Sequence, residues 1–244
     1  MSANVFVRQS KKTNEGDSVE VNRLFPIPEY MNFDPFVLWD HFDVVPGSGF
    51  PDHPHRGFEA ITYMFEGSMQ HTDNLGNDSQ VGVGGAQRFT AGKGIVHSEM
   101  PGSQGSNTGI QLWINLPRRL KKVEPEYQEV MAENIPETKI EGGRVRTVVG
   151  GRSPLKLQTQ VEYEDVDLQS GALWHKTVVE GFRGFVYVVS GSLKIDGRQV
   201  KTAEAYFLDN VEAIDVVAEE HSRFMFCAGR PHGEPIKQWG PYVD

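Results

Sequence analysis

Residues 50–67 read FPDHPHRGFEAITYMFEG, and two histidines one residue apart stand here before a run rich in β-branched and aromatic residues. Successive side chains of an extended chain point to opposite faces, so His53 and His55 share a face. The run from Ala60 to Phe65 is followed by Glu66-Gly67, as is typical of a strand that ends in a turn. The stretch therefore predicts a strand whose entrance carries two imidazoles on one side.

Most other apolar runs are also short, contain β-branched or aromatic residues and are bounded by turn residues. They predict further strands at Ile110 to Asn115, Arg144 to Val149, Gly184 to Val189 and Phe224 to Cys227. Glu124 to Glu133 is the best helical candidate, because it begins with Glu-Pro and carries acids in its first turn. We expect an all-β protein with a few short helices.

An internal similarity indicates a duplication. YMFEGSM (63–69) resembles YVVSGSL (187–193) at an offset of 124 residues. An offset of about half the chain predicts two copies of one β unit of roughly 100 residues. We expect an N-terminal metal-binding domain at residues 1–130 and a C-terminal domain without a metal site at residues 131–244.

The same offset predicts which groups the second copy retains. Only His97 falls on another histidine, His221, unless insertions shift the register. The positions that correspond to His53, His55, Glu59 and Glu99 would be Thr177, Val179, Arg183 and Arg223.

A second pair of possible ligands at the same spacing strengthens the interpretation of His53 and His55 as metal ligands. GKGIVHSEM (92–100) places His97 and Glu99 two residues apart beside a β-branched pair, and Gly94 allows close backbone approach. His53 and His55 alone would equally suit a polar strand entrance. Two strands with two same-face ligands each could surround one ion with three imidazoles and one carboxylate.

The donor set limits the metal without choosing it. Mixed nitrogen and oxygen donors suit iron, manganese, cobalt, nickel, copper or zinc. Structural zinc sites usually contain cysteine and are closed. Four protein ligands leave two positions open on a six-coordinate ion, as activation of a substrate or of O₂ requires.

Other residues that could bind a metal are not expected to be ligands. Glu59 lies four residues after His55 and could be a fifth ligand, although a hydrogen-bond acceptor for an imidazole or a plain strand residue is the preferred interpretation. His71 precedes a turn-rich stretch and is interpreted as a loop residue or a hydrogen-bond partner of a ligand. The remaining histidines have no partner at ligand spacing and are expected to be structural or exposed; they are His41, His175, His221 and His232.

Composition restricts the partners and the compartment. The chain has 24 Lys and Arg against 33 Asp and Glu, a net charge of −9, which disfavours direct nucleic-acid binding but not binding to a DNA-bound protein. Cys227 is the single cysteine, so an intramolecular disulfide and thiolate-rich metal sites are excluded, and its apolar context predicts a core thiol. No signal peptide or membrane span is evident. We expect a cytoplasmic protein, or a nuclear one in a cell with a nucleus.

The motifs taken together resemble two known patterns. Gly47, the two histidines, Glu59 and Gly67, followed by Gly94 and His97, resemble the two cupin motifs, with Gly92 at the usual proline position. Glu99 stands two residues after His97 in the role of fourth ligand, and this departure resembles the pirin family. Pirin-like stretches are DPFVLWDHF (34–42), FPDHPHRGFEAITY (50–63), GKGIVHSEMP (92–101), QLWINLP (111–117), EPEYQE (124–129), VYVVSGSL (186–193) and GEPIKQWGPYV (233–243).

The resemblance implies a bicupin of two β-barrels with one metal ion, usually iron, in the N-terminal barrel. The implied ligands are the residues at His53, His55, His97 and Glu99. It also implies one of two activities: ring opening of a flavonol such as quercetin by O₂, or transcriptional regulation by a metal that senses redox state.

As an oxygenase, the protein would bind a flavonol-like aromatic substrate and O₂ at a divalent ion, expected to be Fe²⁺, with Glu99 accepting the substrate proton. Phe50, Phe58 and Trp113 could form an apolar pocket or simply belong to the core. As a regulator, it would instead present a surface to a protein partner according to the metal's oxidation state. An inert storage-type cupin is the third and weakest alternative, and we expect a monomer in each case.

Overall fold

The computed structural model describes residues 3–244, and the predicted all-β class is confirmed. The helical elements among these residues are two 3₁₀ turns, and no helix in this range has the length and apolar character needed to cross a membrane. The elements in chain order are β1 Asn4–Gln9, β2 Lys11–Glu15, β3 Val19–Phe25, β4 Phe36–Val44, β5 Phe50–His55, β6 Phe58–Glu66, β7 Ser68–Asp73, β8 Asp78–Gly82, β9 Ala86–Thr90, β10 Ile95–Pro101, β11 Asn107–Asn115, η1 Arg118–Leu120, β12 Glu126–Val130, η2 Ala132–Asn134, β13 Glu137–Ile140, β14 Gly143–Val149, β15 Val161–Leu168, β16 Leu173–Thr177, β17 Arg183–Ser190, β18 Ser192–Ile195, β19 Arg198–Lys201, β20 Glu204–Asp209, β21 Ala213–Ala218, β22 Ser222–Gly229, β23 Gln238–Trp239 and β24 Tyr242–Val243.

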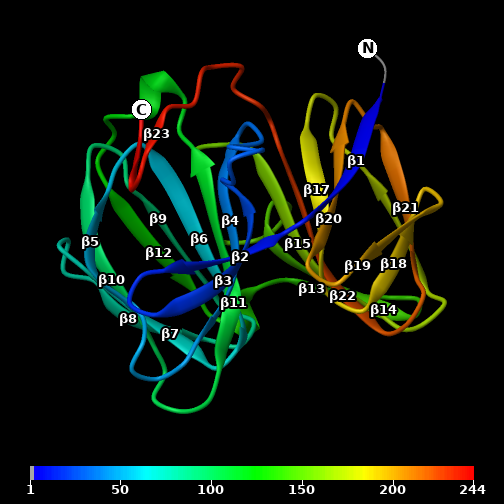
Figure 1. The fold of residues 1–244 in the computed structure, drawn as a ribbon, viewed down its shortest axis with the longest axis horizontal. Helices are drawn as coiled ribbons and strands as arrows, with labels where there is room; N and C mark the ends of the chain where they lie inside the picture. The colour runs from blue at the N-terminus through cyan, green and yellow to red at the C-terminus, as the bar shows by residue number, and fades with distance from the viewer. Residues whose placement is uncertain (1–2) are drawn as a thin grey trace. The chain divides into compact units, whose positions relative to one another are not determined.

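The chain divides into two compact units, each of which draws on separate parts of the sequence (Figure 1). The N-terminal barrel comprises Lys11–Ile135, Leu157–Thr159 and His232–Asp244. The C-terminal barrel comprises the described residues up to Ser10 together with Pro136–Lys156 and Gln160–Pro231. The boundary predicted between residues 130 and 131 remains a prediction.

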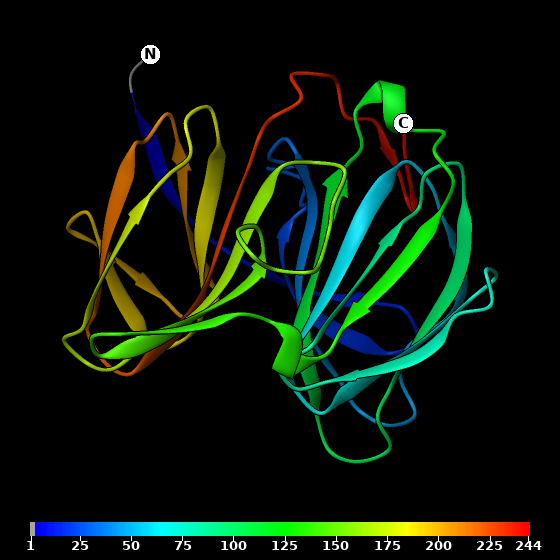
Figure 2. The ribbon, with the colours of Figure 1, turned by 180° about the vertical axis from the view of Figure 1, so that it is seen from behind.

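Each barrel is built from one seven-stranded and one four-stranded antiparallel sheet, which are visible from both sides of the molecule (Figures 1 and 2). In the N-terminal barrel the orders are β12-β9-β6-β11-β4-β3-β2 and β5-β10-β7-β8. In the C-terminal barrel they are β1-β20-β17-β22-β15-β14-β13 and β16-β21-β18-β19. Strands β13 to β22 of the C-terminal barrel follow the same order as strands β2 to β11 of the N-terminal barrel, with eleven added to each strand number.

This equivalence confirms the predicted duplication. Tyr63 and Tyr187 lie on β6 and β17, which hold the same place in their sheets, and both side chains are fully buried. The similar heptapeptides therefore mark one structural position in two copies of one fold.

Strand pairing in the two barrels shows that equivalent residues are not all separated by the constant offset of 124. Glu99 pairs with His71 across β10 and β7, and Val216 pairs with Ile195 across β21 and β18. His71 and Ile195 each lie four residues after the glycine of the repeat, so Val216 is the equivalent of Glu99.

The pairing of β10 with β5 and of β21 with β16 gives further equivalent residues. His97 pairs with His53, and Ile214 pairs with Lys176. The predicted match of His97 with His221 is therefore wrong. The second copy is shorter after the repeated glycine, which shifts every later position of the alignment.

Apolar side chains fill most of the equivalent positions in the C-terminal barrel. The equivalents of His55, His97, Glu99 and His71 all belong to its buried apolar core, and they are Val178, Ile214, Val216 and Ile195. Hydrophobic packing thus occupies the space that polar side chains occupy in the N-terminal barrel.

The helix predicted at Glu124 to Glu133 is wrong. Residues 126–130 form β12, which pairs in register with β9 at the edge of the large sheet. Pairing and the packing of Tyr127 against His71, with ring centroids 4.2 Å apart, override the weak local preference for a helical start.

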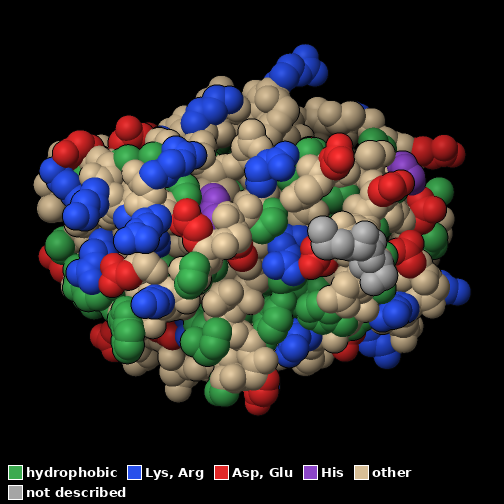
Figure 3. Space-filling model, turned by 90° about the horizontal axis from the view of Figure 1, so that it is seen from above, with side chains coloured by type: hydrophobic (Ala, Val, Ile, Leu, Met, Phe, Trp, Pro, Cys, Tyr) green, Lys and Arg blue, Asp and Glu red, His purple; other side chains and the backbone are tan. Residues whose placement is uncertain are grey.

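Two other expectations concern single residues and the surface. Cys227 is fully buried on β22, where burial raises the pKa of its thiol well above the ordinary value, so the prediction of a core thiol is confirmed. On the face shown in Figure 3, acidic side chains lie among the lysines and arginines. A uniformly basic surface of the kind that binds phosphate backbones is not present on that face.

Candidate metal centre

Three histidines from two paired strands converge inside the N-terminal barrel. His53 and His55 lie on β5, and His97 lies on the neighbouring β10, directly opposite His53. One ligand nitrogen from each ring can be chosen so that all three lie within 4.8 Å of one another. The predicted same-face geometry of the His-x-His pair is thus confirmed, and the triad can bind a metal ion.

Hydrogen bonds at the Nδ1 atoms orient two of these rings. The Nδ1 atom of His53 lies 2.7 Å from the carbonyl oxygen of Pro51, and that of His55 lies 3.2 Å from the carbonyl oxygen of Pro241. A carbonyl oxygen can only accept, so each Nδ1 carries the hydrogen and each Nε2 presents a lone pair.

His97 is oriented by another histidine. Its Nδ1 atom lies 3.3 Å from Nδ1 of His71, whose Nε2 lies 3.0 Å from Oδ2 of Asp73. Because the Asp73 carboxylate accepts, His71 carries its hydrogen on Nε2 and accepts at Nδ1. His97 therefore donates from Nδ1 and presents the lone pair of Nε2 to the centre.

The resulting arrangement fits a cation. The Nε2 atoms of His53 and His97 lie 3.1 Å apart, and both carry lone pairs. Two lone pairs at this distance repel unless a positive charge lies between them. Nitrogen ligands about 2.1 Å from one ion and at right angles to each other would be about 3 Å apart, in agreement with the observed distance.

Burial favours the neutral form of His55 and His97, which is the form that binds metals. Burial, assisted by the nearby charge of His53, lowers the pKa of His55 to about 3. Burial and the neighbouring histidines also lower the pKa of His97 well below its ordinary value. Hydrogen bonds from His71 and Asn77 hold the pKa of Asp73 below its usual value, against the opposing effect of burial.

Glu99 lies beside the triad, and three side chains hold its carboxylate. Oε1 accepts hydrogen bonds from Thr62 (2.6 Å) and Gln87 (2.7 Å), and Oε2 accepts one from Gln111 (2.7 Å). These donors come from β6, β9 and β11 of the large sheet. The carboxylate is not part of the three-histidine group, and one lone-pair position on Oε2 remains for a further partner.

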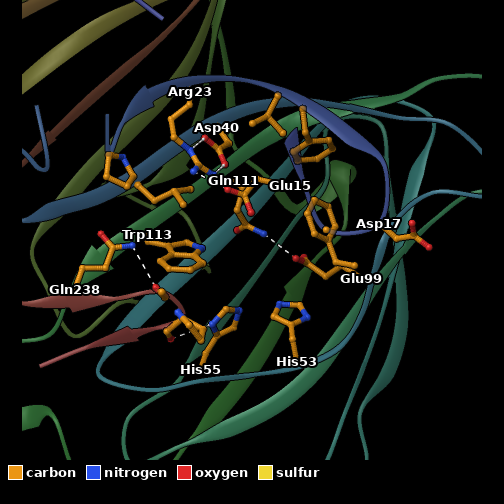
Figure 4. Close-up of a pocket in the computed structure, with 18 of the residues that line it drawn as sticks. Glu15, Asp17, Arg23, Asp40, His53, His55, Glu99, Gln111, Trp113 and Gln238 are labelled. Carbon is orange, nitrogen blue, oxygen red and sulfur yellow. Dashed lines mark hydrogen bonds and ion pairs between the residues drawn. The ribbon is translucent and has the colours of Figure 1, made fainter. Parts of the chain in front are cut away.

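A cavity of about 930 Å³ opens next to these groups (Figure 4). His53, His55 and Glu99 line it, and Trp113 and Phe50 contribute aromatic surface. Its volume lies within the range usual for small-molecule sites.

A buried ion pair forms the cavity wall away from the histidines. Arg23 donates from Nε to Oδ1 of Asp40 (2.8 Å) and from Nη2 to Oδ2 (2.6 Å), and its Nη1 lies 2.6 Å from Glu15. Burial raises the pKa of Asp40 to about 6, against the opposing effect of Arg23. Further carboxylates on the cavity lining are Asp17 and Asp52.

Two sequence expectations need refinement. Phe50 and Trp113 line the cavity as proposed, but Phe58 is buried behind Trp113 with ring centroids 4.1 Å apart. Glu59 accepts hydrogen bonds from Thr90 and from the backbone N–H groups of residues 158 and 159. These bonds involve both of its carboxylate oxygens, so Glu59 anchors a separate segment of the barrel.

Sequence reasoning missed most of the groups that surround the ligands. It indicates His71 only as a loop residue or a hydrogen-bond partner, and His71 is in fact a fully buried strand residue bonded to His97. Gln87 and Gln111 give no signal in the sequence, because their role depends on strand register. The alternation of His71 and Asp73 around Thr72 is the one local pattern that could have indicated an inward-facing pair.

Comparison with known proteins assigns the family. The sequence profile described as Pirin matches residues 18–114, and the profile described as the Pirin C-terminal cupin domain matches residues 163–244. A pirin-like protein of Caulobacter vibrioides is 39% identical over 247 residues, which cover 96% of this chain and 90% of the relative.

Solved structures show the same fold. A quercetin 2,3-dioxygenase from Acinetobacter baumannii is 27% identical, with a TM-score of 0.90 over 98% of this chain and 90% of the other. The bacterial pirin YhhW from Escherichia coli, solved in complex with nickel(II), is 24% identical, with a TM-score of 0.78 over 93% of this chain and 99% of the other. With both profiles matched in order and a relative of this similarity over nearly the whole chain, the protein belongs to the pirin family and is a bicupin.

Proposed function

We propose that this pirin is a metal-dependent dioxygenase that opens the ring of a flavonol-like substrate with O₂. His53, His55 and His97 would hold a divalent ion, with iron as the first expectation, and Glu99 would be the fourth ligand. The observation that carries the proposal is the convergence of three histidine side chains, two of which, His53 and His55, line an accessible cavity. The similarity to a quercetin 2,3-dioxygenase supports the substrate class.

The cavity suits a flat aromatic substrate. Trp113 and Phe50 offer ring surfaces, and the carboxylates of Asp40 and Glu99 can accept hydrogen bonds from phenolic hydroxyl groups. A polyphenol provides both kinds of group. The cavity volume of about 930 Å³ is sufficient for a molecule of this size.

The chain's own residues would position and deprotonate the substrate. A divalent ion at the three histidines supplies Lewis-acid polarisation of a substrate oxygen and a place to activate O₂. Glu99 would use the one lone-pair position of Oε2 that Gln111 leaves, to bind the ion in the absence of substrate and to take the proton of the reacting hydroxyl when substrate is bound. The donors Thr62 and Gln87 hold the other oxygen and so keep the carboxylate directed.

The proposal is tested by O₂ consumption. Purified protein loaded with Fe²⁺ is mixed with quercetin in air, and O₂ uptake is followed beside metal analysis of the same sample. We expect turnover in the wild type and loss of both metal and turnover in His97→Ala. O₂ uptake no greater than that of the His97→Ala control would overturn the flavonol assignment.

Glu99→Gln separates ligation from proton transfer. The amide keeps the size of the side chain but removes the base, so we expect at least a hundredfold fall in kcat, in the range usual for loss of a general base. A metal content close to that of the wild type would place the main role of Glu99 in proton transfer. A metal-replete wild type without turnover on any phenol would instead favour the regulatory role considered from the sequence.

A further inference from the structure

A buried row of three side chains runs from the metal centre to a loop of the N-terminal barrel. His97, His71 and Asp73 follow one another at 3.3 Å and 3.0 Å, and each side chain is at most 1% exposed. We propose that His71 and Asp73 are positioning residues that fix the tautomer of His97 and lower the reduction potential of the bound metal. The inference rests on the proposed metal site, but not on the flavonol substrate.

The order of donors and acceptors in this row is determined at its outer end. A carboxylate can only accept, which puts the hydrogen of His71 on Nε2 and leaves a lone pair on its Nδ1. That lone pair accepts from Nδ1 of His97, whose Nε2 is then free to bind a cation. Asp73 thus controls which nitrogen of His97 faces the metal, although the hydrogen bonds of the row connect the two residues only through His71.

The carboxylate itself is firmly held. Oδ1 of Asp73 accepts from the backbone N–H groups of Leu75 (2.9 Å) and Asn77 (3.1 Å), and the side-chain amide of Asn77 donates to both oxygens. These bonds leave the carboxylate little freedom to turn away from His71.

The ring of His71 is also fixed by packing. It stacks on Tyr127 with ring centroids 4.2 Å apart and an angle of 19° between the planes. The hydroxyl of Tyr127 donates to Oε1 of Gln87, and Nε2 of Gln87 donates to Glu99. One edge-strand tyrosine therefore supports two of the proposed ligands, His97 and Glu99.

The second copy of the fold supports a role tied to the metal. By the strand register given above, the equivalent of His71 in the C-terminal barrel is Ile195, the last residue of β18. Two residues further along the chain, where the first copy has Asp73, the second has Gly197 in the turn after β18. The row of polar groups is therefore absent at the equivalent positions of the barrel in which Val178 and Ile214 replace ligand histidines. The polar pair and the ligand histidines are thus absent together from the second copy.

A strong acceptor at Nδ1 increases the electron density that His97 donates through Nε2. Greater donation stabilises the higher oxidation state of a metal ion more than the lower one, so the reduction potential falls. The carboxylate reaches the centre through His71, which makes this acceptor stronger than a neutral carbonyl.

The test compares three substitutions in the full-length protein. Asp73→Asn keeps the bonds from Leu75 and Asn77 to Oδ1 but loses the one from the Asn77 amide to Oδ2 and turns an N–H group toward His71. That change reverses both tautomers and places a hydrogen on Nε2 of His97. We expect Fe²⁺ affinity, measured by competition with a chelator, to fall between about tenfold and a hundredfold.

His71→Asn and His71→Phe separate hydrogen bonding from packing. In His71→Asn the new amide oxygen can lie near the former position of Nδ1 and accept from His97. We therefore expect Fe²⁺ affinity close to that of the wild type but a more positive reduction potential. His71→Phe keeps the stack on Tyr127 but offers no acceptor, so affinity should fall as in Asp73→Asn.

Asn77→Ala is the matched control, because it removes the amide contact to Asp73 without altering the acceptor of His71. Circular dichroism and thermal unfolding of the metal-free proteins show whether each variant folds. Unchanged affinity in Asp73→Asn, or an unchanged potential in folded His71→Asn, would overturn the inference while leaving the flavonol proposal intact. A wild type that binds no Fe²⁺ would overturn both, whereas metal binding without quercetin turnover would overturn only the proposed activity.

Discussion

At the scale of single residues, the metal centre depends on imidazoles that are buried without a charge. His55 is 3% exposed, and its pKa lies near 3, whereas an exposed or unfolded histidine titrates near 6.5. Below pH 6.5 the unfolded chain binds a proton that the folded, metal-free protein does not bind. The free energy of unfolding must therefore fall as the pH decreases from 6.5 toward 3.

We expect this contribution to be measurable by comparison with His55→Asn. Between pH 7.5 and pH 5.5, the metal-free wild type should lose about 1.4 kcal/mol of stability relative to the variant, since one pKa unit corresponds to 1.36 kcal/mol. Urea denaturation in the presence of a chelator at both pH values measures the difference. A constant difference between the two proteins would contradict the assigned burial effect.

The sequence predicted the convergence of the three histidines well and their surroundings poorly. His53, His55 and His97 were found because same-face spacing in a strand is a local property. Gln87 and Gln111, which hold Glu99, lie 12 residues from it on either side along the chain, and only the pairing of β9 and β11 with β6 brings them together. No local pattern encodes that register.

At the scale of elements, the C-terminal hairpin is part of the metal centre. Its strands β23 and β24 flank residue 241, whose carbonyl oxygen accepts from His55, and Val243 is fully buried in the barrel core. Lys121 donates to the carbonyl oxygen of Val243 at 2.9 Å. A segment distant in sequence thus fixes the orientation of one ligand.

Removal of residues 238–244 should therefore weaken metal binding. We expect Fe²⁺ affinity to fall at least tenfold, because His55 loses the acceptor that fixes its tautomer. Chelator competition measures the affinity of the truncated protein. Arg56→Ala removes the exposed pair with Asp244 and the contact of the guanidinium with the Tyr242 ring but leaves the carbonyl oxygen of residue 241 in place; it is the control and should retain the affinity. Wild-type affinity after truncation would refute this role of the hairpin.

The erroneous helix at Glu124 to Glu133 belongs to the same scale. Glu-Pro followed by acids is a genuine local signal for a helix start. In this chain the neighbouring edge of β9 offers five consecutive pairing positions, and Tyr127 packs inward against His71. Tertiary pairing decides such segments, and it cannot be seen in a window of ten residues.

At the scale of the whole molecule, the two barrels share a strand order but should respond differently to metal. A ligand that binds only the folded state stabilises the structure around its site. Fe²⁺ should therefore slow hydrogen exchange in β5, β7, β10 and the C-terminal hairpin, and leave the equivalent strands β16, β18 and β21 unchanged. Hydrogen exchange followed by mass spectrometry, with Fe²⁺ and with a chelator, measures both sets in one experiment. Equal protection of both sets would contradict a single site.

Each end of the chain belongs to the barrel formed mainly by the other half of the sequence, and this limits how the duplicated protein can evolve. β1 pairs with β20 of the C-terminal barrel, and residues 232–244 belong to the N-terminal barrel. A gene truncated at the middle of the chain would therefore encode neither copy completely: one product would lack its closing hairpin, and the other an edge strand. Loss of the C-terminal copy by a simple deletion would also damage the N-terminal copy, which holds the histidine triad, so inheritance of the two copies as a unit is favoured even if only one of them carries out chemistry.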